Sequence, residues 1–274
     1  MPFYRFDGLS AQRLNPHLST GEGRTIEGRY MYFRTVHKRA GTGSELHYHP
    51  NELMIFPLSG KLNAIVGKER RIVSPGTFVH CPPNARHSMK ATEDGDVDYL
   101  YIKDRTWTLI GVAADEAPPE RAPSPEEIAA AHSAGKWPGG RKAPEKSQAI
   151  IEGLGECYYP ILDNLDMPQS SGSREQWVGG ARLAFGFFEL PRGATNAAGQ
   201  AVNETFVYVL KGALEAEVEG ERRPVGPGDI IHVPKGAPYR FTAGNDLPVR
   251  YCAVRSTAVL EETIDRDGAS DDVR

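Results

Sequence analysis

Short runs rich in Val, Ile, Leu, Phe and Tyr recur along the chain, separated by Gly, Pro, Asn or Asp. A spacing of about 8 to 12 residues between such turn signals is typical of closed β-barrels and sandwiches. The pattern predicts strands over 30–37, 44–49, 53–58, 61–67, 77–82, 86–90 and 97–103, with a second set within 182–256. Gly60 and Gly212 each lie between two runs, where we expect hairpin turns with positive φ.

The two sets of predicted strands share the same order of hydrophobic runs and turn residues. NELMIFPLSG (51–60) aligns with NETFVYVLKG (203–212), and GTFVHCPPNA (76–85) aligns with GDIIHVPKGA (228–237). Both alignments have the same offset of 152 residues and need no gap. A constant offset with turns and hydrophobic runs in phase indicates an internal duplication. The sequence therefore predicts two similar β domains.

The segment between the copies, 113–148, is rich in Pro, Ala and charge and is interpreted as a linker. Within it, Ser124 suits a helix N-cap, Pro125 the first helical position and Gly135 the stop. We expect a first domain over 1–112, this linker with a short helix, and a second domain over 149–274.

Composition narrows the function classes. The 274 residues are 39% hydrophobic and 25% charged with a net charge of -4, and no run of 18 apolar residues occurs. No basic cluster suggests nucleic acid as a partner, and nothing suggests a membrane. The N-terminus lacks the features of a secretory signal, so a cytoplasmic location is expected. The partner we expect is a small-molecule substrate.

Three histidines carry the candidate chemistry. His47 and His49 are two apart on a predicted strand and so point to one face, and His87 lies on another predicted strand. Three imidazoles suit Fe, Mn, Ni, Cu or Zn and leave positions open for a substrate, which favours catalysis. Two hydrogen-bonded histidines without a metal would give the same HxH pattern. The third histidine, and its loss together with the other two in the second copy, favours the metal.

The second copy has none of these ligands. The positions 152 residues after the three histidines hold Gly199, Ala201 and Tyr239. We therefore predict a metal site in the first domain alone.

The motifs resemble those of the cupin superfamily. The first runs Gly41-TGSEL-His47-Tyr-His49-PNELMIFPLS-Gly60, and the second Gly76-TFVHC-Pro82-Pro-Asn84-AR-His87, with Asn84 where the family has Gly. Asn tolerates the left-handed conformation that a turn needs. The resemblance, over about 28–112 and 180–257, implies an all-β fold of two tandem cupin (double-stranded β-helix, jelly-roll) barrels.

One position departs from the family. The place of the family's glutamate ligand is held by Leu53, and the nearby acid, Glu52, is one residue earlier. Adjacent strand residues face opposite sides, so Glu52 is expected outside the metal's ligands unless a bulge re-aims it. Glu52 and His80 are candidate supporting residues around the site.

A three-histidine site without the glutamate is similar to that of gentisate dioxygenase and related ring-cleavage bicupins. This resemblance implies an Fe(II) dioxygenase that cleaves a C–C bond in a small metal-chelating aromatic or hydroxy acid or diketone. A non-oxidative Zn, Mn or Ni isomerase, lyase or cyclase and a non-catalytic binding bicupin are the alternatives. A homodimer is expected, as in many cupins. The candidate pocket residues are Leu53, Ile55, Phe78, Arg34 and Arg86.

Overall fold

Four antiparallel sheets make up the fold in the computed structural model, which describes residues 1–13, 15–135, 143–163, 165, 172–196 and 198–267. The chain divides into two compact units. One, called the N-terminal barrel here, comprises 11–24 and 34–162. The other, the C-terminal barrel, comprises 1–10, 25–33 and 163–274, of which the last described residue is 267.

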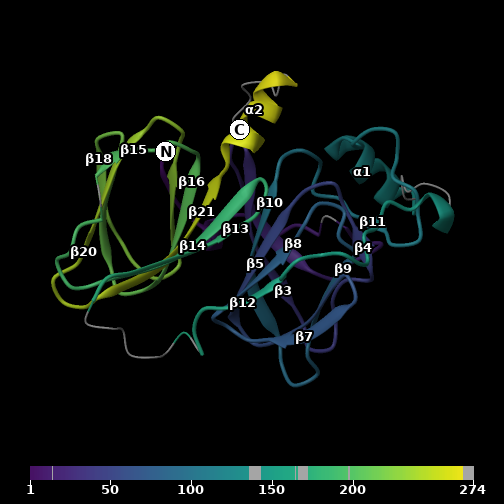
Figure 1. The fold of residues 1–274 in the computed structure, drawn as a ribbon, viewed down its shortest axis with the longest axis horizontal. Helices are drawn as coiled ribbons and strands as arrows, with labels where there is room; N and C mark the ends of the chain where they lie inside the picture. Colours follow the sequence, from purple (N-terminus) through teal and green to yellow (C-terminus); the bar gives the residue numbers. More distant parts are fainter. Residues whose placement is uncertain (14, 136–142, 164, 166–171, 197, 268–274) are drawn as a thin grey trace. The chain divides into compact units, whose positions relative to one another are not determined.

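Two sheets build the N-terminal barrel (Figure 1). The six-stranded sheet has the order β12-β8-β5-β10-β3-β2, with β12 Tyr158–Pro160, β8 Thr77–Cys81, β5 Leu53–Ser59, β10 Val97–Asp104, β3 Met31–Lys38 and β2 Glu22–Glu27. The five-stranded sheet has the order β11-β4-β9-β6-β7, with β11 Val112–Ala113, β4 His47–Tyr48, β9 His87–Ala91, β6 Leu62–Val66 and β7 Glu69–Val73.

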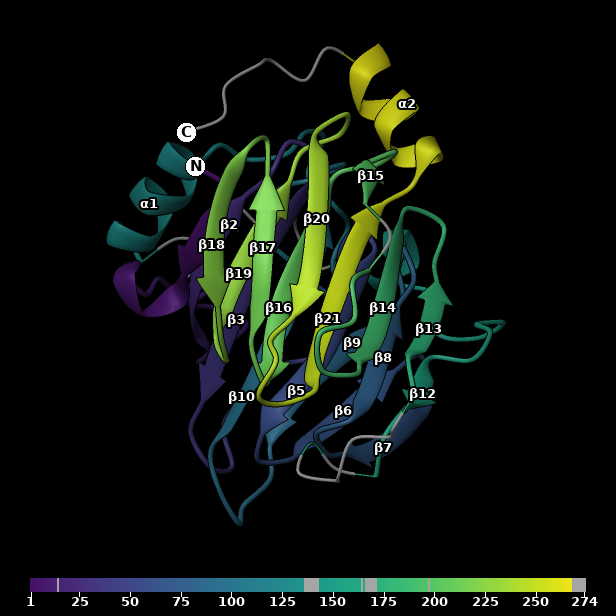
Figure 2. The ribbon, with the colours of Figure 1, turned by 90° about the vertical axis from the view of Figure 1, so that its left-hand side faces the viewer.

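The C-terminal barrel repeats this plan (Figure 2). Its six-stranded sheet has the order β1-β19-β16-β21-β14-β13, with β1 Phe3–Arg5, β19 Asp229–Val233, β16 Thr205–Lys211, β21 Val249–Ser256, β14 Leu183–Leu190 and β13 Arg174–Gly179. Its four-stranded sheet has the order β15-β20-β17-β18, with β15 Gly199–Gln200, β20 Pro238–Ala243, β17 Leu214–Val218 and β18 Glu221–Val225.

The offset of 152 residues carries over into the structure. Strands β5, β6, β8 and β10 correspond to β16, β17, β19 and β21 at that offset, residue for residue. Gly60 and Gly212 have φ of 67° and 75°, and Asn84 has φ of 60°, as the sequence predicts. At Gly60 a Cβ would lie 2.0 Å from the carbonyl oxygen of Asp96, so the hairpin requires glycine for space as well.

The period-two pattern of the strands places the core of the N-terminal barrel. Leu53 and Ile55 on β5 belong to the same buried apolar cluster as Val79 and Cys81 on β8. Cross-strand neighbours share a face, and the register pairs Leu53 with Cys81. Residues of the opposite parity therefore face the other side of this sheet.

Both compact units differ from the expected boundaries of 1–112 and 149–274. Residues 25–33, which include the end of β2 and the start of β3, group with the C-terminal barrel. Strand β1 pairs with β19, so the first residues of the chain belong to the C-terminal barrel. Strand β12 pairs with β8, so residues 149–162 belong to the N-terminal barrel. Each added strand covers what would otherwise be an open sheet edge. A pattern of hydrophobic runs shows that such a strand exists but not which edge it joins.

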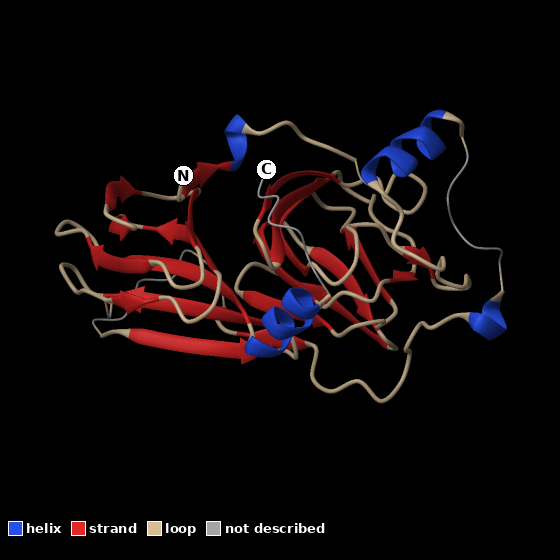
Figure 3. Cartoon of the chain, turned by 90° about the horizontal axis from the view of Figure 1, so that it is seen from above, coloured by secondary structure: helices blue, strands red, loops and turns tan. Residues whose placement is uncertain are grey.

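Within the described residues two segments are α-helical, and Figure 3 shows them outside the strands together with short 3-10 helices. Helix α1 (Pro125–Ser133) begins and ends as the sequence predicts: Glu127 N donates to Ser124 Oγ, Ser124 N donates to the Glu127 carboxylate, and Gly135 has φ of 61°. Helix α2 (Ala258–Arg266), capped by Thr257, was not expected from the sequence. In the described part of the chain no helix has the length and apolarity to cross a bilayer.

Candidate metal centre

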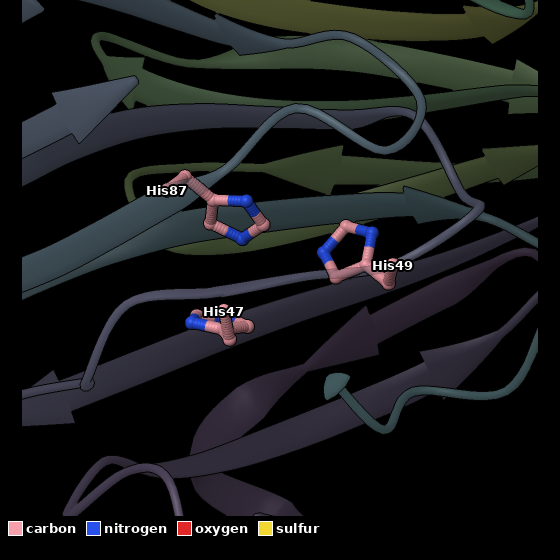
Figure 4. A group of neighbouring side chains, drawn as sticks. All are labelled: His47, His49 and His87. Carbon is pink, nitrogen blue, oxygen red and sulfur yellow. The ribbon is translucent and has the colours of Figure 1, made fainter. Parts of the chain in front are cut away.

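The three predicted histidines come together in the N-terminal barrel (Figure 4). His47 on β4 lies opposite His87 on β9, and His49 follows β4 directly. The ring centroid of His87 is 4.2 Å from that of His47 and 4.7 Å from that of His49. One potential ligand atom from each residue lies within 4.8 Å of the other two. This spacing allows all three to bind a single ion.

A backbone carbonyl orients each imidazole. All three Nδ1 atoms lie 2.8 to 3.0 Å from a carbonyl oxygen two residues away along the chain, with the pairs His47 and Glu45, His49 and Asn51, and His87 and Ala85. A carbonyl only accepts, so each Nδ1 carries the hydrogen and each Nε2 keeps a lone pair. Nε2 of His49 and Nε2 of His87 are buried without a hydrogen-bond partner in the described structure. Unpartnered, converging Nε2 lone pairs fit a divalent metal.

Burial keeps these imidazoles neutral. Desolvation lowers the pKa of His47 and of His49 well below the usual value, and it lowers the pKa of His87 to about 4. The other buried positive groups act in the same direction. Because only the neutral form donates to a metal, all three are ready to bind an ion at neutral pH.

A cavity of about 60 Å³ opens beside the histidines. His47, His87 and Leu53 line it, together with Arg34 and Lys38. No carboxylate is among the described residues that line it. The cavity is therefore positively charged before any metal binds.

Both cationic side chains are held by backbone oxygens. Arg34, 4% exposed, donates from Nη2 to the Gln12 carbonyl at 2.6 Å, and Lys38, 3% exposed, donates from Nζ to the Met89 carbonyl at 2.6 Å. Desolvation, with a smaller effect of Lys90, lowers the pKa of Lys38 to about 7.

A third buried basic side chain, Lys103, lies opposite Leu53 on the neighbouring strand β10. Its Nζ donates to the Thr108 carbonyl at 3.0 Å, and desolvation lowers its pKa. Sequence reasoning missed both lysines. The signal was available, because Lys38 lies four residues from Arg34 on one strand and period two places both on one face.

The other expected pocket residues lie elsewhere. Ile55 is buried in the apolar cluster, and it is absent from the described lining of the cavity, as are Phe78 and Arg86. Phe78 is next to the core residue Val79 on β8, so its side chain points to the other face of the sheet. There its ring centroid lies 4.7 Å from that of Phe56. Arg86 donates from Nη2 to the Gly67 carbonyl at 2.9 Å. Leu53 and Arg34 are thus the two candidates from this group that the structure brings to the histidines.

Glu52 and His80 form a buried pair on the other face of the sheet. Nε2 of His80 lies 2.8 Å from Oε1 of Glu52. The register pairs His80 with Met54, whose side chain points to the face of the sheet opposite to that of Leu53. The duplicate has the same contact, at 2.9 Å between His232 and Glu204. Glu204 also accepts the backbone N–H groups of Arg29 and Tyr30 at 2.7 and 2.9 Å. A contact that recurs in the barrel without metal ligands supports the fold rather than the metal.

Comparisons with known proteins agree with this architecture. A cupin domain family model matches residues 34–103 and 186–255, together more than half of the chain. No curated protein sequence matches the chain.

Among solved structures, one of Bacillus subtilis oxalate decarboxylase, described by its Mn(II) centres, has 16% identity and a TM-score of 0.63, covering 93% of this chain and 77% of that chain. Another, on substrate binding mode and reaction specificity of oxalate decarboxylase, has 18% identity and a TM-score of 0.62 with the same coverage. At these identities the likeness is one of fold, and these structures are not the ring-cleavage dioxygenases suggested by the sequence. With a cupin domain matched in each barrel, the chain belongs to the cupin family and is a bicupin.

Proposed function

We propose that the N-terminal barrel is the catalytic domain of a metal-dependent lyase acting on a small organic acid. One observation carries the proposal: three histidines can direct their Nε2 lone pairs at a common point beside a cavity. The described lining of that cavity has Arg34 and Lys38 but no carboxylate. This arrangement suits a metal that binds an anion.

His47, His49 and His87 would hold the ion. Neutral imidazoles suit Mn, Fe, Ni, Cu or Zn alike, and Mn(II) is the ion named for a structurally similar oxalate decarboxylase. When bound, a divalent ion supplies a Lewis acid that polarises a carboxylate or carbonyl oxygen. With Leu53 in the place of the family's glutamate, no carboxylate among the described residues that line the cavity offsets its charge.

Arg34 and Lys38 would bind and orient the acid. Their buried positions give a carboxylate charge-assisted hydrogen bonds in a low-dielectric setting, where these are stronger than at the surface. Leu53 and Met89 line the same cavity and exclude water from the bound anion. A bound substrate therefore meets positive groups from the protein as well as from the metal.

The cavity size limits the substrate. A water-sized probe fills about 10 to 15 Å³ on the same measure, so 60 Å³ admits only a few non-hydrogen atoms beside the metal. A ring that carries a carboxylate and two hydroxyl groups, as the likeness to gentisate dioxygenase implies, is too large for it. We propose instead a substrate of about the size of a dicarboxylate of two or three carbons.

Metal analysis and a labelled substrate screen test this proposal. Protein purified without chelators should hold close to one divalent ion per chain, and ¹³C-labelled oxalate or malonate should release ¹³CO₂ without consuming O₂. The His49→Ala variant is the metal-deficient control, and Leu190→Met, at the position equivalent to Lys38 in the other barrel, is the matched control with an intact site. Protein without metal, or turnover that consumes O₂ in proportion to product, would overturn the proposal; the second result would restore the dioxygenase hypothesis.

A further inference from the structure

The C-terminal barrel retains a cavity where the other barrel has its histidines. Its volume is about 160 Å³, and Ala201 and Tyr239, which replace His49 and His87, line it. The cationic positions of the N-terminal barrel have changed as well: Gly186 stands at the place of Arg34 and Leu190 at that of Lys38. The C-terminal barrel has therefore lost the histidines and the cationic side chains but has kept an open cavity.

Aromatic rings now define this cavity, and the residues that contribute them are Trp177, Phe188, Tyr239, Phe241 and Tyr251. Phe188 stacks on Tyr251, with centroids 4.7 Å apart and planes at 6°, and meets the Trp177 ring edge-to-face at 5.4 Å. A Cβ on Gly186 would lie 2.9 Å from the Trp177 ring, so the glycine provides the space that the indole occupies.

Two polar groups, the Tyr251 hydroxyl and the Arg255 guanidinium, can orient a ligand in the cavity. The Tyr251 hydroxyl, on a side chain 1% exposed, accepts a hydrogen bond from Asn196 Nδ2 at 2.8 Å and still has its own hydrogen to donate. Burial raises the pKa of Tyr251, so the phenol stays protonated. At the rim, the Arg255 guanidinium carbon is 4.1 Å from the Trp177 ring centroid.

Arg255 is the charged side chain among the described residues that line the cavity, and its charge favours an anion. Arg255 is exposed, and no carboxylate pairs with it within the described part of the chain. The nearby Glu175 accepts the Trp177 indole N–H at 2.6 Å. That hydrogen bond holds the indole in place beneath Arg255.

We propose that the C-terminal barrel binds a monocyclic aromatic carboxylate, with its ring among the aromatic side chains and its carboxylate at Arg255. A cavity of about 150 Å³ lined by apolar side chains accommodates benzene, so 160 Å³ suits one ring. Aromatic faces and edges provide stacking partners for that ring, and a guanidinium pairs with a carboxylate. This binding site is separate from the metal centre, and the inference does not depend on the lyase proposal.

Binding of 4-fluorobenzoate, followed by ¹⁹F NMR and calorimetry, tests the inference. Wild-type protein should bind it, and so should His49→Ala, which removes a metal ligand from the other barrel. Arg255→Gln should weaken binding about tenfold, as expected for loss of one charge-assisted contact. Arg222→Gln, an exposed arginine of β18 outside the cavity lining, is the matched control and should leave binding unchanged.

A neutral analogue separates the two parts of the site. Affinity for 4-fluorobenzyl alcohol should be insensitive to Arg255→Gln, whereas Trp177→Leu should weaken binding of both compounds. Absence of 4-fluorobenzoate binding at 10 mM to the wild type would overturn the inference. So would binding that is lost in His49→Ala, because the anion would then occupy the metal centre, or binding that is unaffected by both cavity variants.

Discussion

Replacing Lys38 by Met should make the protein more stable while weakening its hold on an anionic substrate. The side chain is 3% exposed in the N-terminal barrel, its Nζ donates to the Met89 carbonyl, and its pKa is lowered to about 7 by burial. A lysine retained at such a cost to folding is expected to serve binding. Met has a similar length and no charge, so it removes the ammonium and leaves the packing nearly unchanged.

The magnitude follows from the pKa difference. Lys38 has a lower pKa in the folded state, about 7, than in the unfolded state, 10.5, so its charged form opposes folding. At about 1.4 kcal/mol per pKa unit, this is about 5 kcal/mol below pH 7 and nothing above pH 10.5. The variant loses one hydrogen bond, about 1 kcal/mol. The Met89 carbonyl still accepts from the Ser44 amide at 3.0 Å, so it is not left unpaired.

Urea unfolding at several pH values measures the effect. At pH 6 we expect Lys38→Met to raise the free energy of unfolding by about 2 to 4 kcal/mol, and the gain should vanish as the pH approaches 10. Substrate KM should rise about tenfold or more through loss of a charge-assisted contact. Leu190→Met, at the equivalent position in the C-terminal barrel, should show no such pH-dependent gain. A destabilised variant at pH 6, or an unchanged KM, would refute the reasoning.

Three further predictions concern the metal, a buried acid and a turn. His49→Ala should abolish the rise in Tm that Mn(II) gives the wild type, measured by differential scanning fluorimetry, whereas the exposed His37→Ala should retain it. Glu204→Ala should lower the free energy of unfolding by about 2 to 4 kcal/mol, because two backbone amides and a histidine lose their acceptor; a loss below 1 kcal/mol in urea unfolding would contradict this. Gly60→Ala should cost more than about 2 kcal/mol, since its Cβ would strike a carbonyl oxygen at 2.0 Å. Gly220→Ala, also at positive φ but with open space around it, should cost about 1 to 2 kcal/mol in the same assay.

Several features follow from the sequence because they depend on local rules. The period of two along a strand places His47 and His49 on one face, and the second motif supplies His87. The duplication at a fixed offset shows that the second copy lacks all three, with Gly199, Ala201 and Tyr239 in their places. Turn glycines and the cap of α1 are equally local, since φ preference and the first helical turn depend on neighbouring residues. The structure contains each of these features.

Other features depend on which residues meet across the fold. Alternation along a strand defines two faces but does not tell which of them faces the core. Phe78 and Arg86, which the sequence suggests as pocket residues, therefore lie outside the described lining of the cavity. Lys38 and Lys103 break the rule that charged residues are exposed, and only the structure shows that both are buried and that Lys38 lines the cavity.

The sequence by itself thus determined a duplicated β fold and one set of three histidines, because alternation and repetition are properties of the chain. The tertiary structure decided the rest: the pairing of β1 with β19 and of β12 with β8, the positive charge around the histidines, and the aromatic cavity of the C-terminal barrel. These features arise from pairing and burial between residues far apart in sequence. Local patterns constrain such contacts without specifying them.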